Sequence, residues 1–142
     1  MTAPTYPDIA AFLVANLDRE QAIAFRAMDS DDEPRWAIRE QPVHQTDFTI
    51  SPEVVCSGHD GGGITTWEQA THIVEHQPRK VLDDITAKRQ IIKACVLFRD
   101  SRAREGNPVI DTLVAIWEKK ILYPLAAPFA DQPGYQQEWA VG

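Results

Sequence analysis

The sequence has few of the residues that build a disulfide-stapled or membrane-spanning protein. Of its 142 residues, only two are cysteines and four are histidines. The two cysteines, Cys56 and Cys95, are too few for the disulfide framework of a small secreted protein, so we expect a cytoplasmic location. The first twenty residues lack the basic start and long apolar stretch of a secretory signal. Apolar runs elsewhere are too short to cross a bilayer, so we expect no membrane partner.

The composition is that of an ordinary globular protein. Hydrophobic residues make up 44% of the chain, charged residues make up 25%, and the formal net charge is −7. A chain of this length buries roughly 68–70% of its unfolded surface, which is enough for one hydrophobic core. We therefore expect a single domain over residues 1–142. The acidic balance reverses in residues 79–106, where eight basic residues stand against four acidic ones.

Apolar spacing predicts a mainly helical chain. Residues 7–28 place apolar side chains close to a 3.6-residue period, with Asn16 and Glu20 as the two breaks. The same spacing, together with capping and proline signals, predicts further helices over residues 65–76, 78–104, 108–122 and 131–139. We expect Gly106 to end the longest helix, and Asn107-Pro108 to begin the next.

Residues 35–65 differ from the helical segments. Their β-branched and aromatic residues occur in short stretches separated by prolines and glycines, which is typical of strands. The stretches fall at residues 35–39, 47–50 and 53–56. The expected fold class is therefore α+β, mainly α, with four to five helices and a small antiparallel sheet of two or three strands inserted after the first helix.

The helical period also predicts which side chains face the core. In the first helix they are Ile9, Phe12, Leu13, Leu17, Ile23, Ala24, Ala27 and Met28. In the longest helix they are Val81, Leu82, Ile85, Ile92, Cys95, Val96 and Phe98. In the helix after it they are Ile110, Leu113, Val114, Trp117 and Ile121.

Two stretches resemble the signatures of a known family. Residues 72–92 are similar to the pattern HIxxHxPxxVLxxxxAKRxII. Residues 125–139 are similar to LALPYADHPGYxEEW, with departures at Phe129, Gln132 and Gln137. Both resemble a family of small uncharacterised proteins from actinobacteria and their phages, and the opening AFLVANLDRE is similar to that family as well. The resemblance implies a cytoplasmic, phage-derived protein and brings no known activity.

Four residues have the spacing of a zinc site. Cys56 and His59 are spaced C-x2-H, and His72 and His76 are spaced H-x3-H on one face of a predicted helix. A thiolate with three imidazoles suits zinc better than magnesium or calcium. The alternative is that the two helical histidines are ordinary hydrogen-bonding residues and that Cys56 lies in a strand. His72 to His76 also spells the inverted zinc-protease motif H-x-x-E-H, with Glu75 as the base, but five residues make a weak signal.

The basic segment 79–104 has two interpretations. Lys88, Arg99 and Arg102 fall within about 60° of one another on a helix and are candidates for nucleic-acid contacts. The other basic residues wrap around the helix, and the rest of the chain is acidic and repels phosphate. The alternative is that these residues pair with the acidic N-terminal segment.

The C-terminal segment carries Tyr135 and Trp139, two large aromatic residues on a short stretch. In one interpretation they pack back over the helices and close the core. In the other they form an exposed anchor for another protein, since tyrosine and tryptophan often dominate binding energy.

No arrangement of residues supports a catalytic site. The chain has no G-x-S-x-G nucleophile elbow, and Cys95 falls on the apolar side of a helix. We therefore expect a non-enzymatic protein-interaction or regulatory module, phage-derived and acting on a host protein. It would have no cofactor. A zinc-binding module and, less well supported, a nucleic-acid-binding protein are the alternatives.

Overall fold

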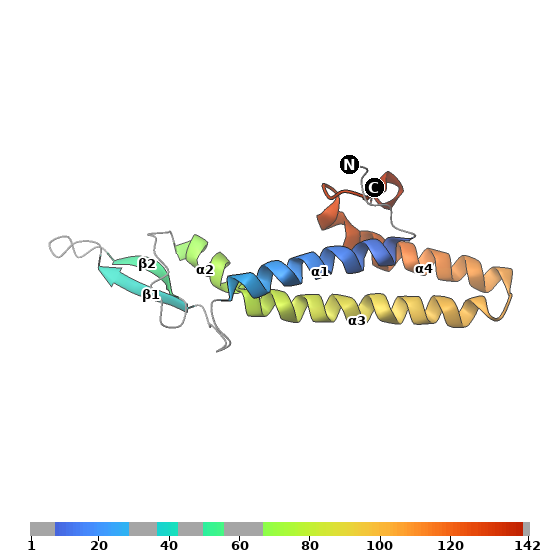
Figure 1. Ribbon diagram of the computed structural model, residues 1–142, viewed down its shortest axis with the longest axis horizontal. Coiled ribbons are helices and arrows are strands. Elements are labelled where there is room, and N and C mark those ends of the chain that lie inside the picture. The colour runs from blue at the N-terminus through green and yellow to red at the C-terminus, as the bar shows by residue number, and fades with distance from the viewer. Residues whose placement is uncertain (1–7, 29–36, 43–49, 56–66, 141–142) are drawn as a thin grey trace. The chain divides into compact units, whose positions relative to one another are not determined.

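The coordinates are a computed structural model that describes residues 8–28, 37–42, 50–55 and 67–140, with only the backbone for residues 37–42 and 50–55. This part of the chain forms four α-helices, two strands and two single turns of 3-10 helix (Figure 1). In chain order they are α1 (Ile9–Ala27), β1 (Ala37–Pro42), β2 (Ile50–Val55), α2 (Trp67–Glu75), α3 (Pro78–Ala103), α4 (Pro108–Ala126), η1 (Ala127–Phe129) and η2 (Gln137–Trp139).

The predicted α+β fold class is wrong, because helices alone build the packed part of the described structure and the strands do not form a layer of it. Wherever the structure describes side chains, at residues 8–28 and 67–140, the chain forms only helices and turns. The strands β1 and β2 pair antiparallel, from Ala37 opposite Val55 to Pro42 opposite Ile50. Two strands of six residues make a ribbon, which is too small to serve as a sheet layer on which helices build a core.

The chain divides into two compact units. One consists of residues 1–20 and 85–142, and the other of residues 21–84. The second unit contains the β1–β2 ribbon and α2, which lies against both strands. The first unit contains most of the described hydrophobic core. The single-domain expectation for residues 1–142 stays a prediction.

Helix α1 begins at an aspartate cap and buries one stripe. The Asp8 carboxylate accepts a hydrogen bond from the Ala11 N–H at 2.9 Å, satisfying a donor that the helix leaves unpaired. Asn16, predicted as a break in the stripe, is buried, and its side-chain N–H donates to the Phe12 carbonyl oxygen at 2.9 Å. Ile23 was predicted to face the core but is exposed. The side chains buried as predicted are Ile9, Phe12, Leu13, Leu17 and Ala24.

Helices α3 and α4 form a hairpin around a turn that the sequence predicted. Gly106 has a φ of +62°, the left-handed conformation that favours glycine. The Asn107 side chain accepts a hydrogen bond from the Val109 N–H at 3.0 Å and so caps α4. The predicted end at Leu122 is wrong, because α4 continues through Pro124. A proline removes one intrahelical bond, but the Ala127 N–H still donates to the Tyr123 carbonyl oxygen and completes the last turn.

The cap gives a first testable prediction. Replacing Asn107 by alanine removes the only acceptor described for the Val109 N–H and should lower the free energy of unfolding by about 1 kcal/mol. Asn107→Asp keeps an acceptor at the same place and should change the free energy of unfolding by less than half as much. Urea denaturation of both variants tests this, and equal losses would contradict the role of the cap.

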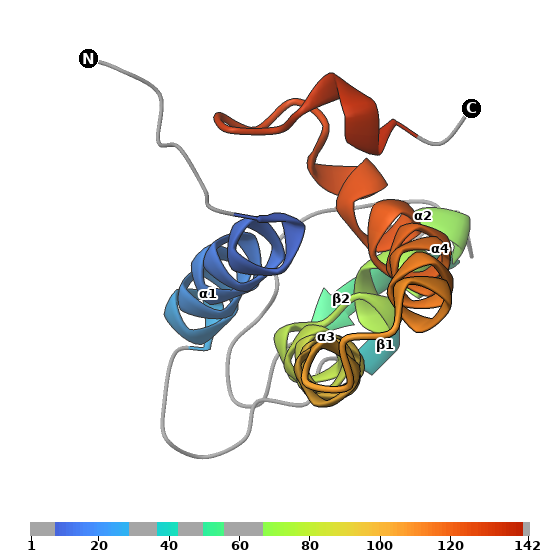
Figure 2. The ribbon, with the colours of Figure 1, turned by 90° about the vertical axis from the view of Figure 1, so that its right-hand side faces the viewer.

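The tail after α4 closes the core over α1. Figure 2, which looks along the helices, shows this segment crossing from α4 toward the N-terminal part of α1. The Phe12 ring lies 5.0 Å from Trp139, 5.9 Å from Tyr135 and 6.4 Å from Phe129, measured between ring centroids. The helix predicted over residues 131–139 is instead a turn, with Gly134 at a φ of +90°, followed by the single turn η2. Aromatic packing therefore fixes a segment that has little regular structure of its own.

Candidate functional site

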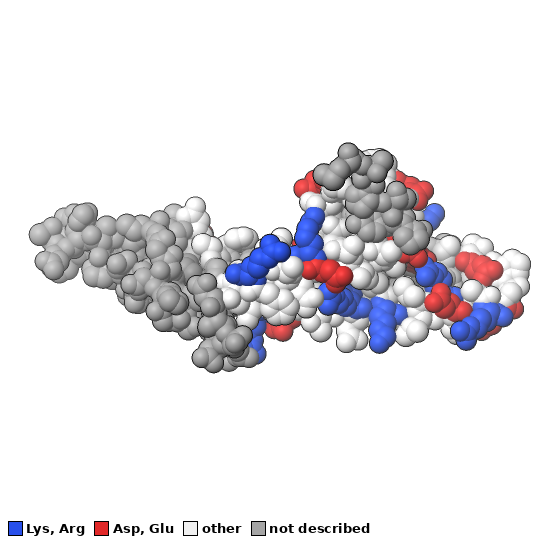
Figure 3. All heavy atoms as spheres, in the orientation of Figure 1, with Lys and Arg blue, Asp and Glu red and all other residues white. Residues whose placement is uncertain are grey.

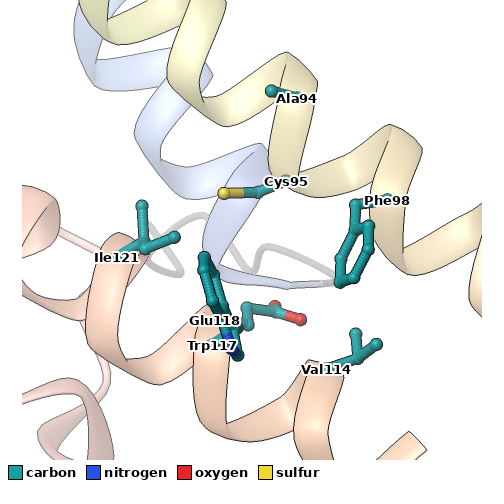
Figure 4. Close-up of a pocket in the computed structure, with 7 residues that line it drawn as sticks. All are labelled: Ala94, Cys95, Phe98, Val114, Trp117, Glu118 and Ile121. Carbon is teal, nitrogen blue, oxygen red and sulfur yellow. The ribbon is translucent and has the colours of Figure 1, made fainter. Parts of the chain in front are cut away.

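The most prominent feature of the first unit is an apolar groove between α3 and α4. It has a volume of about 400 Å³. Ala94, Cys95 and Phe98 line it from α3, and Val114, Trp117, Glu118 and Ile121 line it from α4. Figure 4 shows Cys95 and Phe98 of α3 facing α4, with the Trp117 ring opposite Cys95 and between Ile121 and Phe98 in this view. We call this feature the α3/α4 groove.

Large apolar side chains at the groove are exposed where the sequence predicted core. Trp117 is 60% exposed and Leu113 is 53% exposed, and Phe98 is also exposed. Those three core predictions are wrong. On α4 the exposed residues Val109, Leu113, Ile116 and Trp117 recur at helical spacing and form one stripe. We call it the outer stripe. Val114, Leu122 and Ala126 are buried on the other side of α4, so the helix is apolar on both sides.

The single carboxylate of the groove is neutralised within the chain. Glu118 lies 3.7 Å from the Arg99 guanidinium, which also lies 3.1 Å from Asp8. Burial alone would lower the pKa of Arg99, but its hydrogen bonds to Asp8 and Asp100 and the charges of Glu118 and Asp8 raise it overall. Arg99 therefore keeps its positive charge, and the groove presents an apolar surface without an unpaired charge.

Cys95 gives a second testable prediction. Burial, and secondarily the charge of Glu118, raises the pKa of its thiol. The thiolate is the reacting form, so a raised pKa leaves less of it at any given pH, and alkylation should be slow. In dilute Cys56→Ser protein, the pH midpoint for alkylation by iodoacetamide should lie above that of the same chain unfolded in urea. Glu118→Gln should move this midpoint down toward the unfolded one. An alkylation midpoint at or below that of the unfolded chain would contradict a raised pKa of the Cys95 thiol.

A second hollow, of about 310 Å³, lies between the start of α1, α4 and the tail. Three carboxylates line it, those of Asp8, Glu118 and Glu138, together with Tyr123. Burial, then the charges of Glu138 and Glu118, raises the pKa of Tyr123. Two of the three carboxylates, those of Asp8 and Glu118, already pair with Arg99.

The structure brings together half of the predicted zinc site. His72 lies on α2 and His76 in the turn directly after it, with ring centroids 4.2 Å apart, and both are exposed. The Nδ1 atom of His76 lies 2.9 Å from the His72 carbonyl oxygen. Cys56 and His59 lie outside the described residues. Among the residues that are described, no three His, Cys, Asp or Glu side chains are grouped closely enough to hold a metal ion.

Glu75, the base of the inverted protease motif, is already engaged. Its carboxylate lies 2.9 Å from the Lys80 ammonium, and this hydrogen bond and charge lower its pKa. A general base near neutral pH needs a raised pKa, so the arrangement does not favour hydrolytic chemistry at this position.

The predicted nucleic-acid residues are mostly engaged in ion pairs. Arg99 pairs with Asp8 and Glu118, and Arg102 pairs with Glu105 at 2.8 Å while lying over the Phe98 ring. Lys88 is half-buried. On the face drawn in Figure 3, basic and acidic groups alternate, and no continuous basic stripe forms.

The pairing of the basic helix with the acidic N-terminal segment is confirmed. Besides the Arg99–Asp8 pair, Arg89 of α3 pairs with Asp18 of α1. This is the alternative that the charge pattern of the sequence left open.

Of the predicted partner anchors Tyr135 and Trp139, Trp139 lies in the core of the first unit, and Tyr135 is half-buried against it. Trp139 is 3% exposed, and its ring centroid is 5.7 Å from that of Tyr135, with the two rings perpendicular. The geometry supports the alternative in which they close the core. The candidate surface that the sequence missed is the α3/α4 groove with the adjoining outer stripe, since the spacing of Leu113, Trp117 and Phe98 predicts ordinary core positions.

Comparisons with known proteins give one match. In the described residues, no helix is long and apolar enough to cross a membrane. No curated protein and no solved structure matches the chain significantly. The predicted membership of an uncharacterised family is confirmed, whereas the actinobacterial and phage origin stays a prediction. Residues 6–141 match the model of a family described as a family of unknown function (DUF6221), and the chain therefore belongs to that family.

Proposed function

We propose that the protein is a non-enzymatic protein-interaction module and that the α3/α4 groove is its binding face. The observation that carries the proposal is a groove of about 400 Å³ whose lining is apolar, with the exposed Trp117 and Phe98 inside it. Monomeric proteins seldom leave such a patch to water, and exposed patches of this kind mark interaction sites. Tryptophan is also the residue type most enriched among those that dominate binding energy.

The groove best fits an amphipathic helix as its occupant. It lies between two antiparallel helices, and a third helix packs into such a groove by laying an apolar stripe along it. Because Arg99 neutralises Glu118, a charged ligand would find no unpaired charge of opposite sign in the groove. The apolar stripe of a helix would enter the groove at little cost in free energy, because it has no polar groups to remove from water.

A photo-crosslinking experiment tests the proposal. A benzophenone amino acid is placed at position 113 in the outer stripe or, as the control, at position 97. Position 113 lies one helical turn from Trp117, where the outer stripe adjoins the groove. Leu97 is a leucine of α3 that is 60% exposed and belongs neither to the groove lining nor to the outer stripe. In cells of the source organism, position 113 should crosslink to another polypeptide chain at least tenfold more than position 97. A Trp117→Glu change should abolish the difference. Equal yields from the two positions would overturn the proposal.

Zinc binding is the second candidate function. It is supported by the His72–His76 pair, in which the Nδ1 atom of His76 has a backbone carbonyl partner and Nε2 is the nitrogen left for a metal. Cys56 and His59 would complete the ligand set. Near-stoichiometric zinc in untagged protein, lost in Cys56→Ser and His72→Ala, would support this function. Absence of metal together with an unchanged melting temperature in chelator would exclude it.

The remaining expectations rest on the sequence alone. The cytoplasmic location rests on the low cysteine content, and the phage derivation and host target rest on the family resemblance. Nucleic-acid binding through Lys88, Arg99 and Arg102 is the weakest of the candidates, because ion pairs within the chain already use two of these residues.

A further inference from the structure

We infer that the α3/α4 groove and the outer stripe are covered by the α3–α4 hairpin of a second copy of this chain. Two α3–α4 hairpins would then meet face to face and form a four-helix dimer. The inference rests on the proposed function, because it names the partner of the same face.

The outer stripe of α4 extends the apolar surface of the groove. Val109, Leu113, Ile116 and Trp117 make α4 apolar on its outer side, although the opposite side of α4 is already buried within the chain. A helix that is apolar on both sides is normally buried on both sides. Groove and outer stripe adjoin at Trp117, so a single face of one chain offers both halves of a self-complementary contact.

Helix α3 adds a self-complementary pattern of large and small residues. Ala87, Ile91, Ala94 and Phe98 follow one another at alternating intervals of four, three and four, the spacing of a helix-packing seam. All four are exposed. When two such helices pair antiparallel about a point between Ile92 and Lys93, Ile91 lies opposite Ala94 of the other copy. Phe98 lies opposite Ala87. Each large side chain thus meets a small one, as close packing of two helices requires.

The exposed apolar area matches what a stable dimer needs. The side chains that contribute it are Ile91, Phe98, Val109, Leu113, Ile116 and Trp117, all between about two fifths and two thirds exposed. Together they expose roughly 500–600 Å² of apolar surface per chain, taking roughly 150–250 Å² for each aromatic side chain and somewhat less for each aliphatic one. Complete burial in two copies would remove about 1,000–1,200 Å² of apolar surface from water, which approaches the lower bound of specific protein–protein interfaces before any polar rim is counted.

Sedimentation equilibrium of the full chain tests the inference. Wild-type protein should have the mass of two chains at micromolar concentration. Leu113→Glu should weaken the association at least a hundredfold, and the matched control Leu97→Glu should leave it unchanged. Both leucines are more than half exposed, so both variants should keep the helical circular dichroism of the wild type. A wild type that has the mass of one chain up to millimolar concentration would overturn the inference. So would equal dissociation of the two variants.

A second experiment measures alkylation of Cys95 in protein that carries no glutamate substitution in the proposed interface. Cys95 lines the groove, so a second hairpin on that face should protect its thiol. In the Cys56→Ser background, alkylation of Cys95 should slow at least tenfold as protein concentration rises through the association range. A rate independent of concentration would overturn the dimer through this face.

The crosslinks from position 113 separate this inference from the function on which it rests. Crosslinks to the same chain, together with a mass of two chains, support both. Crosslinks only to other polypeptides, with a mass of one chain, leave the interaction function standing and overturn the homodimer. The absence of specific crosslinks together with a mass of one chain overturns both.

Discussion

Replacing Phe12 by alanine should lower the free energy of unfolding by about 3–5 kcal/mol. Phe12 is fully buried in α1 and has the rings of Phe129, Tyr135 and Trp139 within 6.4 Å. Deleting its ring removes the transfer free energy of the side chain and leaves a cavity where three aromatic partners met. Since a domain of this size is stable by only about 5–15 kcal/mol, the variant should lose a large share of its stability.

Phe25→Ala provides the matched control on the same helix. Phe25 is 54% exposed, so its replacement should lower the free energy of unfolding by less than about 1 kcal/mol. Urea denaturation followed by circular dichroism measures both variants under the same conditions. Comparable losses for the two phenylalanines would show that the core is not organised around Phe12.

The first helix shows how far local rules of sequence reach. Leu13 and Leu17 follow Ile9 at helical spacing and are buried as predicted, because one apolar stripe on an amphipathic helix has only one way to avoid water. Asn107 and Gly106 were placed correctly for a similar reason. A side-chain cap and a left-handed glycine depend on a few neighbouring residues and need no knowledge of the rest of the fold.

Trp117 shows where those rules stop. Its spacing with Leu113 predicted core, yet both side chains are exposed. Periodicity identifies a face that is apolar, but it does not tell whether that face is buried by the same chain or by another molecule. The α3/α4 groove therefore corresponds in the sequence to an excess of apolar residues around α4, which periodicity alone does not distinguish from core.

The prediction of the fold class is wrong for a different reason. The β-branched residues of this region predict strands, and the α+β class further requires that these strands form a sheet on which the helices pack. Whether strands become a layer depends on how many pair and on what packs against them, which are long-range properties. The predicted zinc site likewise depends on long-range properties of the fold. The i, i+4 spacing places His72, in the last turn of α2, beside His76, which directly follows the helix, but the position of Cys56 relative to them depends on the whole fold.

The second large effect is expected at Trp139. Trp139→Ala should lower the free energy of unfolding by about 3–5 kcal/mol, because the side chain is 3% exposed and packs on Phe12 and Tyr135. The matched control is Trp117→Ala, since Trp117 is 60% exposed and its loss should lower the free energy of unfolding by less than about 1 kcal/mol. Both variants are measured in the Leu113→Glu background, so that association does not contribute to stability.

The same unfolding measurement shows whether the tail after α4 packs on α1 and contributes to the stability of the core. Because the rings of Phe12 and Trp139 are 5.0 Å apart, the double variant Phe12→Ala/Trp139→Ala should lose less stability than the sum of the two single losses, with all three variants measured in the Leu113→Glu background. A shortfall of about 1 kcal/mol or more is expected for two aromatic side chains in contact. Strict additivity, or equal losses at Trp139 and Trp117, would mean that η2 does not pack on α1. Phe12 would then have no aromatic partner from η2, and the buried surface of α1 would have to be assigned to other residues.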